Sequence, residues 1–443
     1  MNFPKKDQII SLEIHGMGSG GEGVGSQDGY VVFVDGALPG ELVEARMVES
    51  RKRHGFAELH SITRSSPDRM KPPCPLFGRC GGCQVMHLAY PNQLEMKRQR
   101  VVDALQRIGK IDSFVAPCLP SPSPLAYRNK IQLPVKSSGK EIAFGLYARS
   151  SHDLVEVDAC PIHCSLGDAV YQTVRKILKR CDQELRHLLI KSAVRTQETL
   201  VIVVANRPPS PLLSELAQEI LAAHPSIQGV VHNQHAGRDN VILGRIYQTL
   251  AGSNTIQERL GDLTFKISAA SFFQVNPAQA ERLYEKAVEF ADLTGKESVL
   301  DAYCGVGTLS LYFAKRAKKV LGVECVAQAI ENARENAKLN GIRNVSFSVA
   351  AAEDVIGKLS QIDVALLNPP RKGCEPSFLD GLGRLSPKKI IYISCDPATL
   401  ARDLARLLKF GYEVDAVQPF DMFPQTTHVE TVVRLRTCTK TGF

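Results

Sequence analysis

The sequence predicts a multidomain protein with an N-terminal small OB-like β-barrel, a central α+β domain and a C-terminal α/β domain of the doubly wound, Rossmann-like type. Short alternating strands broken by Gly and Pro turns fill residues 7–64, which indicates the barrel. From residue 297 onward strands alternate with helices, a pattern typical of a parallel sheet covered on both faces. A chain of 443 residues is long enough for such a division.

Composition and charge indicate a cytoplasmic protein with a basic surface. The net charge is +8 and the isoelectric point is near 8.8, a moderate basic excess that fits a polyanion as partner. The N-terminus lacks the apolar run of a secretory signal, and stretches such as LVIVVA are too short to span a bilayer. In a reducing compartment, the clustered cysteines among the twelve are expected to be metal ligands or catalytic groups.

Changes in composition divide the chain into three predicted domains, residues 1–66, 67–265 and 266–443. The Pro- and Ser-rich stretch SSPDRMKPP (65–73) marks the end of the barrel. An amphipathic helix is expected at 91–110, followed by helices mixed with strands such as KIQLPV, TLVIVVA, GVVHN and VILGR. Near the C-terminus only a loop separates YEVDAVQPF from HVETVVRLR, which predicts an antiparallel pair.

The stretch CPLFGRCGGC (74–83) places three cysteines at the spacing C-x5-C-x2-C. A zinc ribbon prefers paired C-x2-C knuckles, whereas glycines between thiols suit a loop wrapped around a larger cluster. A [4Fe–4S] cluster needs four thiolates, so these three would need a fourth partner. The candidates are Cys118, Cys160 and Cys164.

The stretch VLDAYCGVGTLSL (299–311) indicates a nucleotide-like site at the end of a strand. Asp301 ends the apolar run, and a G-x-G turn follows, where glycine lets a ligand approach the backbone closely. The next predicted strand ends in Glu324, which is placed to accept hydrogen bonds from a ribose diol. Residue 310 is Ser where a dinucleotide fingerprint has Gly, so S-adenosylmethionine fits better than a dinucleotide.

Three further stretches carry candidate catalytic groups. LLNPPRKG (366–373) ends a strand in a rigid turn, at the edge where open α/β sheets bind ligands. Cys395 in YISCDPATL ends another strand just before a helix, whose N-terminus favours a thiolate. Glu430, at the start of the last apolar strand, is a candidate general base, and His428 is its rival.

These stretches together resemble the RNA uracil-5-methyltransferase family, which uses S-adenosylmethionine, and especially its bacterial 23S rRNA members. The first segment resembles a TRAM domain, a small RNA-binding barrel, and CPLFGRCGGCQ with VDACPI resembles the family's iron–sulfur signature. SFFQVN, DAYCGVG, LNPPRKG, YISCDPATLARD and FPQTTHVETV resemble its catalytic motifs. The resemblance runs nearly end to end and implies a class I methyltransferase fold for the C-terminal domain.

The resemblance also implies roles for individual residues. Cys395 is expected to be the nucleophile that adds to uracil C6, and Glu430 the base that removes the C5 proton. The expected S-adenosylmethionine-binding residues are Gln274, Tyr303, Glu324 and Asn368. The expected ligands of a [4Fe–4S] cluster that staples the fold are Cys74, Cys80, Cys83 and Cys160, with Cys164 as runner-up. The family commonly has Asp at position 368, and Asn loses a charge near the sulfonium.

Three functions remain open on the sequence alone. The first is a methyltransferase that forms 5-methyluridine in 23S rRNA, and the second is a tRNA uracil-5-methyltransferase. The third is a non-catalytic iron–sulfur RNA-binding protein on the same fold. RNA is the expected partner, with no membrane and no protein partner, so the chain is expected to be a monomer. Arg128 in YRNK is either a phosphate contact or part of a solvated basic turn.

Overall fold

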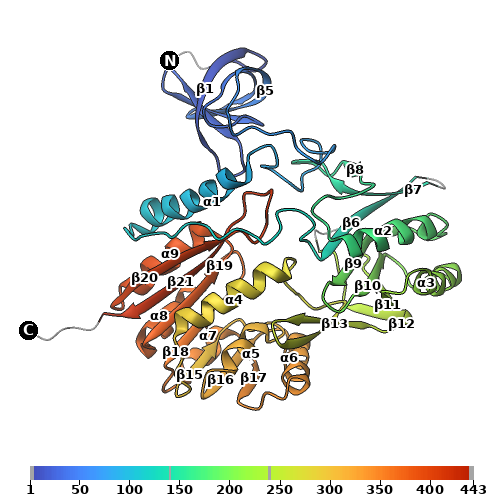
Figure 1. Cartoon of the computed structure of the whole chain (residues 1–443), viewed down its shortest axis with the longest axis vertical. Coiled ribbons are helices and arrows are strands. Elements are labelled where there is room, and N and C mark those ends of the chain that lie inside the picture. The colour runs from blue at the N-terminus through green and yellow to red at the C-terminus, as the bar shows by residue number, and fades with distance from the viewer. Residues whose placement is uncertain (1–3, 139–140, 238–240, 439–443) are drawn as a thin grey trace, which may run out of the picture.

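The computed structural model describes residues 4–138, 141–237 and 241–438, and three bodies of β-structure follow one another along them (Figure 1). A closed barrel comes first, a seven-stranded sheet occupies the middle of the chain, and a second seven-stranded sheet ends it. The barrel and the C-terminal α/β sheet confirm the predicted architecture at both ends. The boundaries placed at residues 66 and 265 stay a prediction.

The N-terminal barrel has the strand order β1-β2-β3-β5-β4 and closes through pairing of β1 with β4. Side chains along β1 alternate between exposed and buried, so one face of each strand fills the interior with residues such as Leu12, Val32 and Met47. The strands are β1 (Ile9–Met17), β2 (Gly23–Gln27), β3 (Tyr30–Asp35), β4 (Leu42–Ser50) and β5 (His54–Arg64).

A long connection leads from the barrel across the C-terminal sheet. It includes the cysteine-rich loop, the helix α1 (Tyr90–Ala104) and one π-helical turn, η1 (Leu105–Gly109). The predicted helix at 91–110 is therefore an α-helix that ends in a π-turn, and Lys110 follows with φ of +54°. Val115 then pairs with Val417 as an isolated bridge, so this connection packs on the last domain.

The central region is a mixed sheet of strand order β12-β11-β10-β9-β6-β7-β8. Helices α2 (Ser165–Leu178) and α3 (Pro211–Ala223) bury apolar side chains on one face, and α3 connects the parallel pair β10–β11. Ile202 and Val231 on the other face join the core of the C-terminal domain. The strands are β6 (Lys130–Ser138), β7 (Glu141–Tyr147), β8 (Leu154–Glu156), β9 (Leu185–Ala193), β10 (Glu198–Ala205), β11 (Ile227–Gln234) and β12 (Ile246–Gly252).

A hairpin of β13 (Thr255–Leu260) and β14 (Leu263–Ser268) leads into the C-terminal sheet, whose order is β17-β16-β15-β18-β19-β21-β20. The first five of these strands are parallel, while β21 runs antiparallel to β19 and to β20. The antiparallel pair β20–β21 was predicted from the sequence. The strands are β15 (Ser298–Asp301), β16 (Lys319–Glu324), β17 (Val345–Val349), β18 (Val364–Leu367), β19 (Lys389–Ser394), β20 (Tyr412–Phe420) and β21 (Glu430–Thr437).

Helices cover both faces of the C-terminal sheet (Figure 1). One face packs against α4 (Pro277–Ala291), α5 (Thr308–Ala314) and α6 (Ala327–Leu339). The other packs against α7 (Ala352–Ile356), α8 (Pro376–Leu385), α9 (Pro397–Leu408) and also α1. Within the described ranges, no helix has both the length and the apolarity needed to cross a lipid bilayer.

Candidate active site

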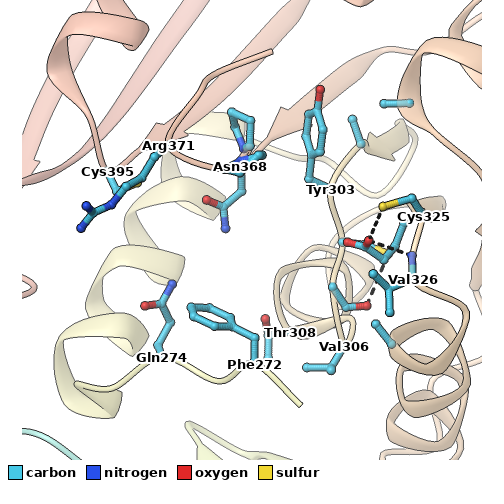
Figure 2. A pocket seen from close by; sticks show the side chains of 18 of the residues that line it. Phe272, Gln274, Tyr303, Val306, Thr308, Cys325, Val326, Asn368, Arg371 and Cys395 are labelled. Carbon is cyan, nitrogen blue, oxygen red and sulfur yellow. Dashed lines mark hydrogen bonds between the residues drawn. The ribbon is translucent and has the colours of Figure 1, made fainter. Parts of the chain in front are cut away.

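A pocket of about 800 Å³ opens at the carboxyl ends of the parallel strands of the C-terminal sheet (Figure 2). This is the edge where open α/β sheets bind ligands, because loops from several strands converge there. The residues predicted for catalysis and for S-adenosylmethionine binding all line it: Gln274, Tyr303, Glu324, Asn368, Cys395 and Glu430. Segments more than 150 residues apart in the chain thus meet in one cavity.

The glycine turn after β15 forms one wall of the pocket. Gly305 and Gly307 have φ of +54° and +82°, a region in which a side chain would be strained, and Gly307 caps α5. Asp301 at the end of β15 is fully buried and accepts a 2.6 Å hydrogen bond from Ser310 Oγ. Burial raises the pKa of Asp301 to about 7. Its other oxygen has no hydrogen-bond partner among the described residues.

Glu324 ends β16, the strand next to β15, as the sequence predicted. One carboxylate oxygen accepts hydrogen bonds from the backbone N–H of Val326 (3.0 Å) and from the Cys325 thiol (3.2 Å; Figure 2). These two contacts use a single oxygen, so the second can accept hydrogen bonds from a ligand. The position suits the two hydroxyls of a ribose.

Gln274, Tyr303 and Asn368 line the same pocket from three separate loops. Gln274 precedes α4, and Asn368 follows β18, so their carboxamides enter the pocket from different sides (Figure 2). Tyr303 packs edge-on against Phe378, with ring centroids 5.8 Å apart, which fixes the plane of its ring. An aromatic ring and two carboxamides offer the stacking surface and hydrogen bonds that an adenosine-type ligand needs.

Cys395 lies between the end of β19 and the start of α9, where the sequence placed it. Asp396 caps α9 by accepting hydrogen bonds from Ala398 N and Thr399 N, both 2.9 Å. The helix N-terminus favours a thiolate at Cys395, but the surroundings of the thiol act in the opposite direction. Burial, and then the nearby Glu430, raise the pKa of the Cys395 thiol to about 11.

Glu430 begins β21, next to β19, so strand pairing brings it near Cys395. The carboxyl group is buried, and burial raises its pKa to about 8. Arg371 is the cation that opposes burial at both positions, because it lowers the pKa of Cys395 and of Glu430. Sequence reasoning missed Arg371, although it directly follows the Asn-Pro-Pro turn in LLNPPRKG.

His428 lines the pocket two residues before Glu430, and its ring lies edge-on to Phe423 at 6.0 Å. Burial, and then Arg371, lower the pKa of His428 to about 4. The imidazole is therefore neutral near pH 7, and its lowered pKa makes it a weaker base than an ordinary histidine. The structure thus keeps both candidate bases, His428 and Glu430, in contact with the same cavity.

The four predicted cluster ligands approach one another. Burial raises the pKa of Cys83 to about 12, and the thiols of Cys160, Cys80 and Cys74 add to this effect. Burial, with smaller contributions from Cys74 and Cys80, also raises the pKa of Cys160. Over the described part of the chain, however, no group of three or more His, Cys, Asp or Glu side chains is arranged to hold a metal ion.

The rival fourth ligands have other surroundings. Cys164 is buried and caps α2 by accepting a 3.4 Å hydrogen bond from Gly167 N. Cys118 lies beside Lys97 and Asp421, away from the cysteine-rich loop. Arg128, a candidate phosphate contact, is half-buried and donates to Lys130 O at 2.9 Å, and its charge acts on Cys83.

The sheet and its pocket define the class of the protein. A parallel doubly wound sheet with an antiparallel final pair, a glycine turn after β15 and an acid after β16 is the framework of a class I, S-adenosylmethionine-dependent methyltransferase. Within that class, the chain belongs to the RNA uracil-5-methyltransferase family. The tRNA (uracil-5-)-methyltransferase family model matches residues 89–438, and the TRAM domain model matches residues 6–60.

Individual relatives agree with this assignment. The chain is 42% identical to an uncharacterized RNA methyltransferase of Clostridium acetobutylicum over 98% of each protein. It is 41% identical to one of Listeria innocua, over 97% of this chain and 98% of that one. Among solved structures it is similar to Pyrococcus abyssi tRNA (uracil-54, C5)-methyltransferase in complex with S-adenosyl-L-homocysteine, with a TM-score of 0.76, 28% identity and coverage of 96% and 100%. The protein is an S-adenosylmethionine-dependent RNA methyltransferase with an N-terminal TRAM domain.

Proposed function

We propose that the enzyme methylates C5 of a uridine in 23S rRNA through a covalent adduct between Cys395 and uracil C6. The observation that carries this proposal is the joint placement of Cys395, Glu430 and Arg371 around one pocket. Uracil C5 is a poor nucleophile, so a methyl transfer to it needs prior activation. A thiol and a carboxylate on the same side of a nucleotide-sized cavity provide that activation and its reversal.

The reaction proceeds in three stages: addition of the thiolate, transfer of the methyl group, and elimination. The Cys395 thiol loses its proton to solvent, so the Glu430 carboxylate stays free, and the thiolate forms a bond to C6. The resulting enolate-like C5 attacks the methyl carbon of S-adenosylmethionine, which supplies an electrophilic methyl group and leaves as S-adenosylhomocysteine. The Glu430 carboxylate then removes the C5 proton, the C5–H electrons form the C5=C6 double bond, and the C6–S bond breaks. Arg371 stabilises the anionic forms of both residues.

The methyl donor is expected to lie across the loops that follow β15, β16 and β18. Glu324 accepts hydrogen bonds from the ribose, and Tyr303 supplies an aromatic face. Gln274 and Asn368 hydrogen-bond the polar end of the ligand. Asn368 keeps an acceptor for this purpose but has no charge to offer the sulfonium.

The covalent step is tested with Cys395→Ala. This variant is expected to lose methyl transfer to uridine and to form no adduct with RNA containing 5-fluorouridine, whose C5 fluorine blocks the final proton removal. Cys438→Ala is the matched control, because Cys438 is exposed and lies outside the pocket. Full methylation by the Cys395→Ala variant would refute the covalent mechanism.

The proposal also specifies the RNA substrate, 23S rRNA rather than tRNA. A TRAM domain and four cysteines that approach one another favour 23S rRNA, whereas the similar Pyrococcus abyssi enzyme acts on tRNA and supports that alternative. Assays on isolated tRNA and on rRNA fragments separate the two. Mapping 5-methyluridine in total RNA with and without the gene identifies the modified position.

We propose further that Cys74, Cys80, Cys83 and Cys160 hold a [4Fe–4S] cluster. Two observations support this proposal: four thiols approach one another, and glycines lie between three of them. A bound cluster would tie the loop at 74–83 to the central sheet. Protein purified without oxygen is expected to be brown, with about four irons per chain. Colourless protein with one zinc would overturn this assignment and leave the catalytic proposal intact.

A further inference from the structure

The loop that joins β20 to β21, residues 421–429, forms the wall of the pocket that ends at Glu430. We name it the base loop. Its residues Phe423 and His428 line the cavity, and Glu430 follows directly. The role of Glu430 as the general base is part of the proposed function, and the following inference rests on that role.

Residues far away in the sequence hold the backbone of the base loop. Lys97 Nζ donates to Phe423 O at 3.0 Å, and the Tyr127 hydroxyl donates to Pro424 O at 3.1 Å. The Arg100 guanidinium donates to Thr427 O. These donors all come from the connection that contains α1, about 300 residues earlier in the chain.

Gln425 is the centre of this arrangement. It is buried and has φ of +69°, a left-handed conformation that costs a residue other than glycine about 1–2 kcal/mol. Its carbonyl accepts hydrogen bonds from both Gln84 N and Val85 N, each at 3.1 Å. The surrounding structure therefore compensates for the unfavourable backbone conformation, as is common at functional sites.

Gln93 on α1 completes the support of Gln425 through a reciprocal pair. Gln93 Oε1 accepts from Gln425 N at 3.0 Å, and Gln93 Nε2 donates to Gln425 Oε1 at 3.0 Å. The same amide nitrogen also lies within hydrogen-bond distance of Leu88 O, at 2.8 Å. Gln93 is 1% exposed, so no water is available to replace these contacts.

A buried ion pair fixes the first residue of the loop. Lys97, one helical turn beyond Gln93, donates to Asp421, and both side chains are fully buried. Together the two residues anchor the loop at its start and at its most strained point. The remaining four residues, 426–429, lead directly to the proposed base.

We propose that Gln93 and Lys97 are positioning residues that hold the base loop in the conformation required for removal of the C5 proton by Glu430. In this step the C5–H bond breaks, its electrons form the C5=C6 bond, and the C6–S bond to Cys395 breaks. Addition of the thiolate and transfer of the methyl group precede it and depend on β19 and the cofactor loops. Loss of Gln93 therefore slows one step of the reaction and spares the others.

The test compares Gln93→Leu with Gln99→Leu, the same change at an exposed position of α1 whose side chain contacts Asp103. With ordinary uridine RNA, Gln93→Leu is expected to lower turnover at least about 10-fold, since general base catalysis contributes about 10²–10⁴-fold. The covalent enzyme–RNA complex should accumulate on denaturing gels. Adduct formation with 5-fluorouridine RNA involves no removal of a C5 proton, so its rate should stay within about 3-fold of wild type.

Equal losses in adduct formation and turnover, or no loss in either, would overturn the proposal. If Gln93→Leu does not fold, Gln425→Gly supplies the same test, because glycine accepts the positive φ and removes only the paired side chain. Failure of the wild-type enzyme to form any adduct with 5-fluorouridine RNA would instead refute the covalent mechanism itself. The two outcomes are therefore distinguishable.

Discussion

Burial and one cation, Arg371, have opposite effects on the pKa values of the two proposed catalytic residues. Burial raises the pKa of Cys395 to about 11 and that of Glu430 to about 8, and Arg371 lowers both. The ligand-free pocket therefore stores both groups mainly in their protonated forms at neutral pH. A cationic methyl donor adds positive charge to the pocket, which favours their ionised forms once it binds.

The pH dependence of the reaction follows from these shifts. Glu430 acts as a base only when deprotonated, so the rate of adduct breakdown should rise with pH through about 8. Arg371→Leu removes the cation that lowers both pKa values, so the rise should move to higher pH. Single-turnover rates measured across pH provide the test, with exposed Arg384→Leu on α8 as the control. A shift to lower pH would contradict the assigned role of Arg371.

Asn368 offers a separate test at the donor site. Asn368→Asp places a negative charge near the sulfonium and should tighten S-adenosylmethionine binding by about 5-fold, the equivalent of about 1 kcal/mol. Binding of S-adenosylhomocysteine, whose sulfur is neutral, should change less, and the selectivity for uracil should not change. Identical calorimetric affinities for S-adenosylmethionine before and after the substitution would remove position 368 from the electrostatic account.

The site residues that were predicted from the sequence differ from those that were missed in the sequence pattern around them. Cys395 and Glu324 stand at the ends of apolar strands, where a polar residue interrupts a clear pattern. Arg371, Gln93 and Lys97 give no such signal, because a basic or amide residue in a loop or on a helix looks like ordinary surface. The contacts that bury Gln93 and Lys97 span more than 300 residues, and Arg371 acts on residues at the ends of two later strands. Periodicity in a short window does not register such contacts.

At the scale of elements, α1 combines a polar sequence with a buried role. Its buried positions include Gln93 and Lys97 as well as Val101, so its apolar periodicity is weak. The structure accommodates the polar side chains by pairing them with the base loop, in particular with Asp421. The predicted strand VILGR at 241–245 is wrong for a related reason, because Asn233 exchanges hydrogen bonds with Gly244 and holds this segment outside the sheet.

The buried pair of Lys97 and Asp421 makes a prediction about stability. Lys97→Met leaves the Asp421 charge buried without a partner and should lower the free energy of unfolding by about 3–5 kcal/mol. Adding Asp421→Leu should recover most of that loss, because no unpaired charge remains. Urea unfolding measures both. Removal of the exposed pair Arg46–Glu58 is the control and should cost less than about 1 kcal/mol.

At the scale of the whole molecule, the glycine-rich turn between β1 and β2 of the barrel, residues 18–22, contacts the base loop. A side chain at Gly21 would lie 3.1 Å from Thr427 Cγ2 and 3.2 Å from both Gln84 and Val85. On the other side of the turn, Arg149 of the central region donates to Gly20 O at 3.2 Å. The barrel, the cysteine-rich connection and the methyltransferase domain therefore meet at one junction.

Gly21→Val tests whether this junction matters for catalysis. The added side chain should displace the base loop and lower turnover on RNA about 10-fold or more, since a misplacement of about 1 Å can cost about 10²-fold. Gly29→Val is the matched control, because Gly29 also has positive φ but a Cβ there meets nothing within 4 Å. If both substitutions lowered turnover equally, backbone strain alone would explain the loss, and the junction would have no role in catalysis.

The domains were predictable from the sequence, but their packing was not. Each sheet has its own pattern, alternating burial in β1 and fully buried strands in β15 and β18, and such patterns are local. The junction near Gly21 depends on close approach of segments from three regions, and a glycine-rich turn alone predicts only flexibility. Contacts between such distant segments leave no periodic pattern in the sequence, so the sequence does not predict them.

The docking of residues 101–119 on the C-terminal sheet has a consequence for synthesis. Val115 and Leu119 pair with Val417 and Phe420, so their partners leave the ribosome last. At about 5–20 residues per second, this wait is about 15–60 s. The barrel closes with partners that are already made, whereas the apolar face at Val101 and Leu105 stays uncovered.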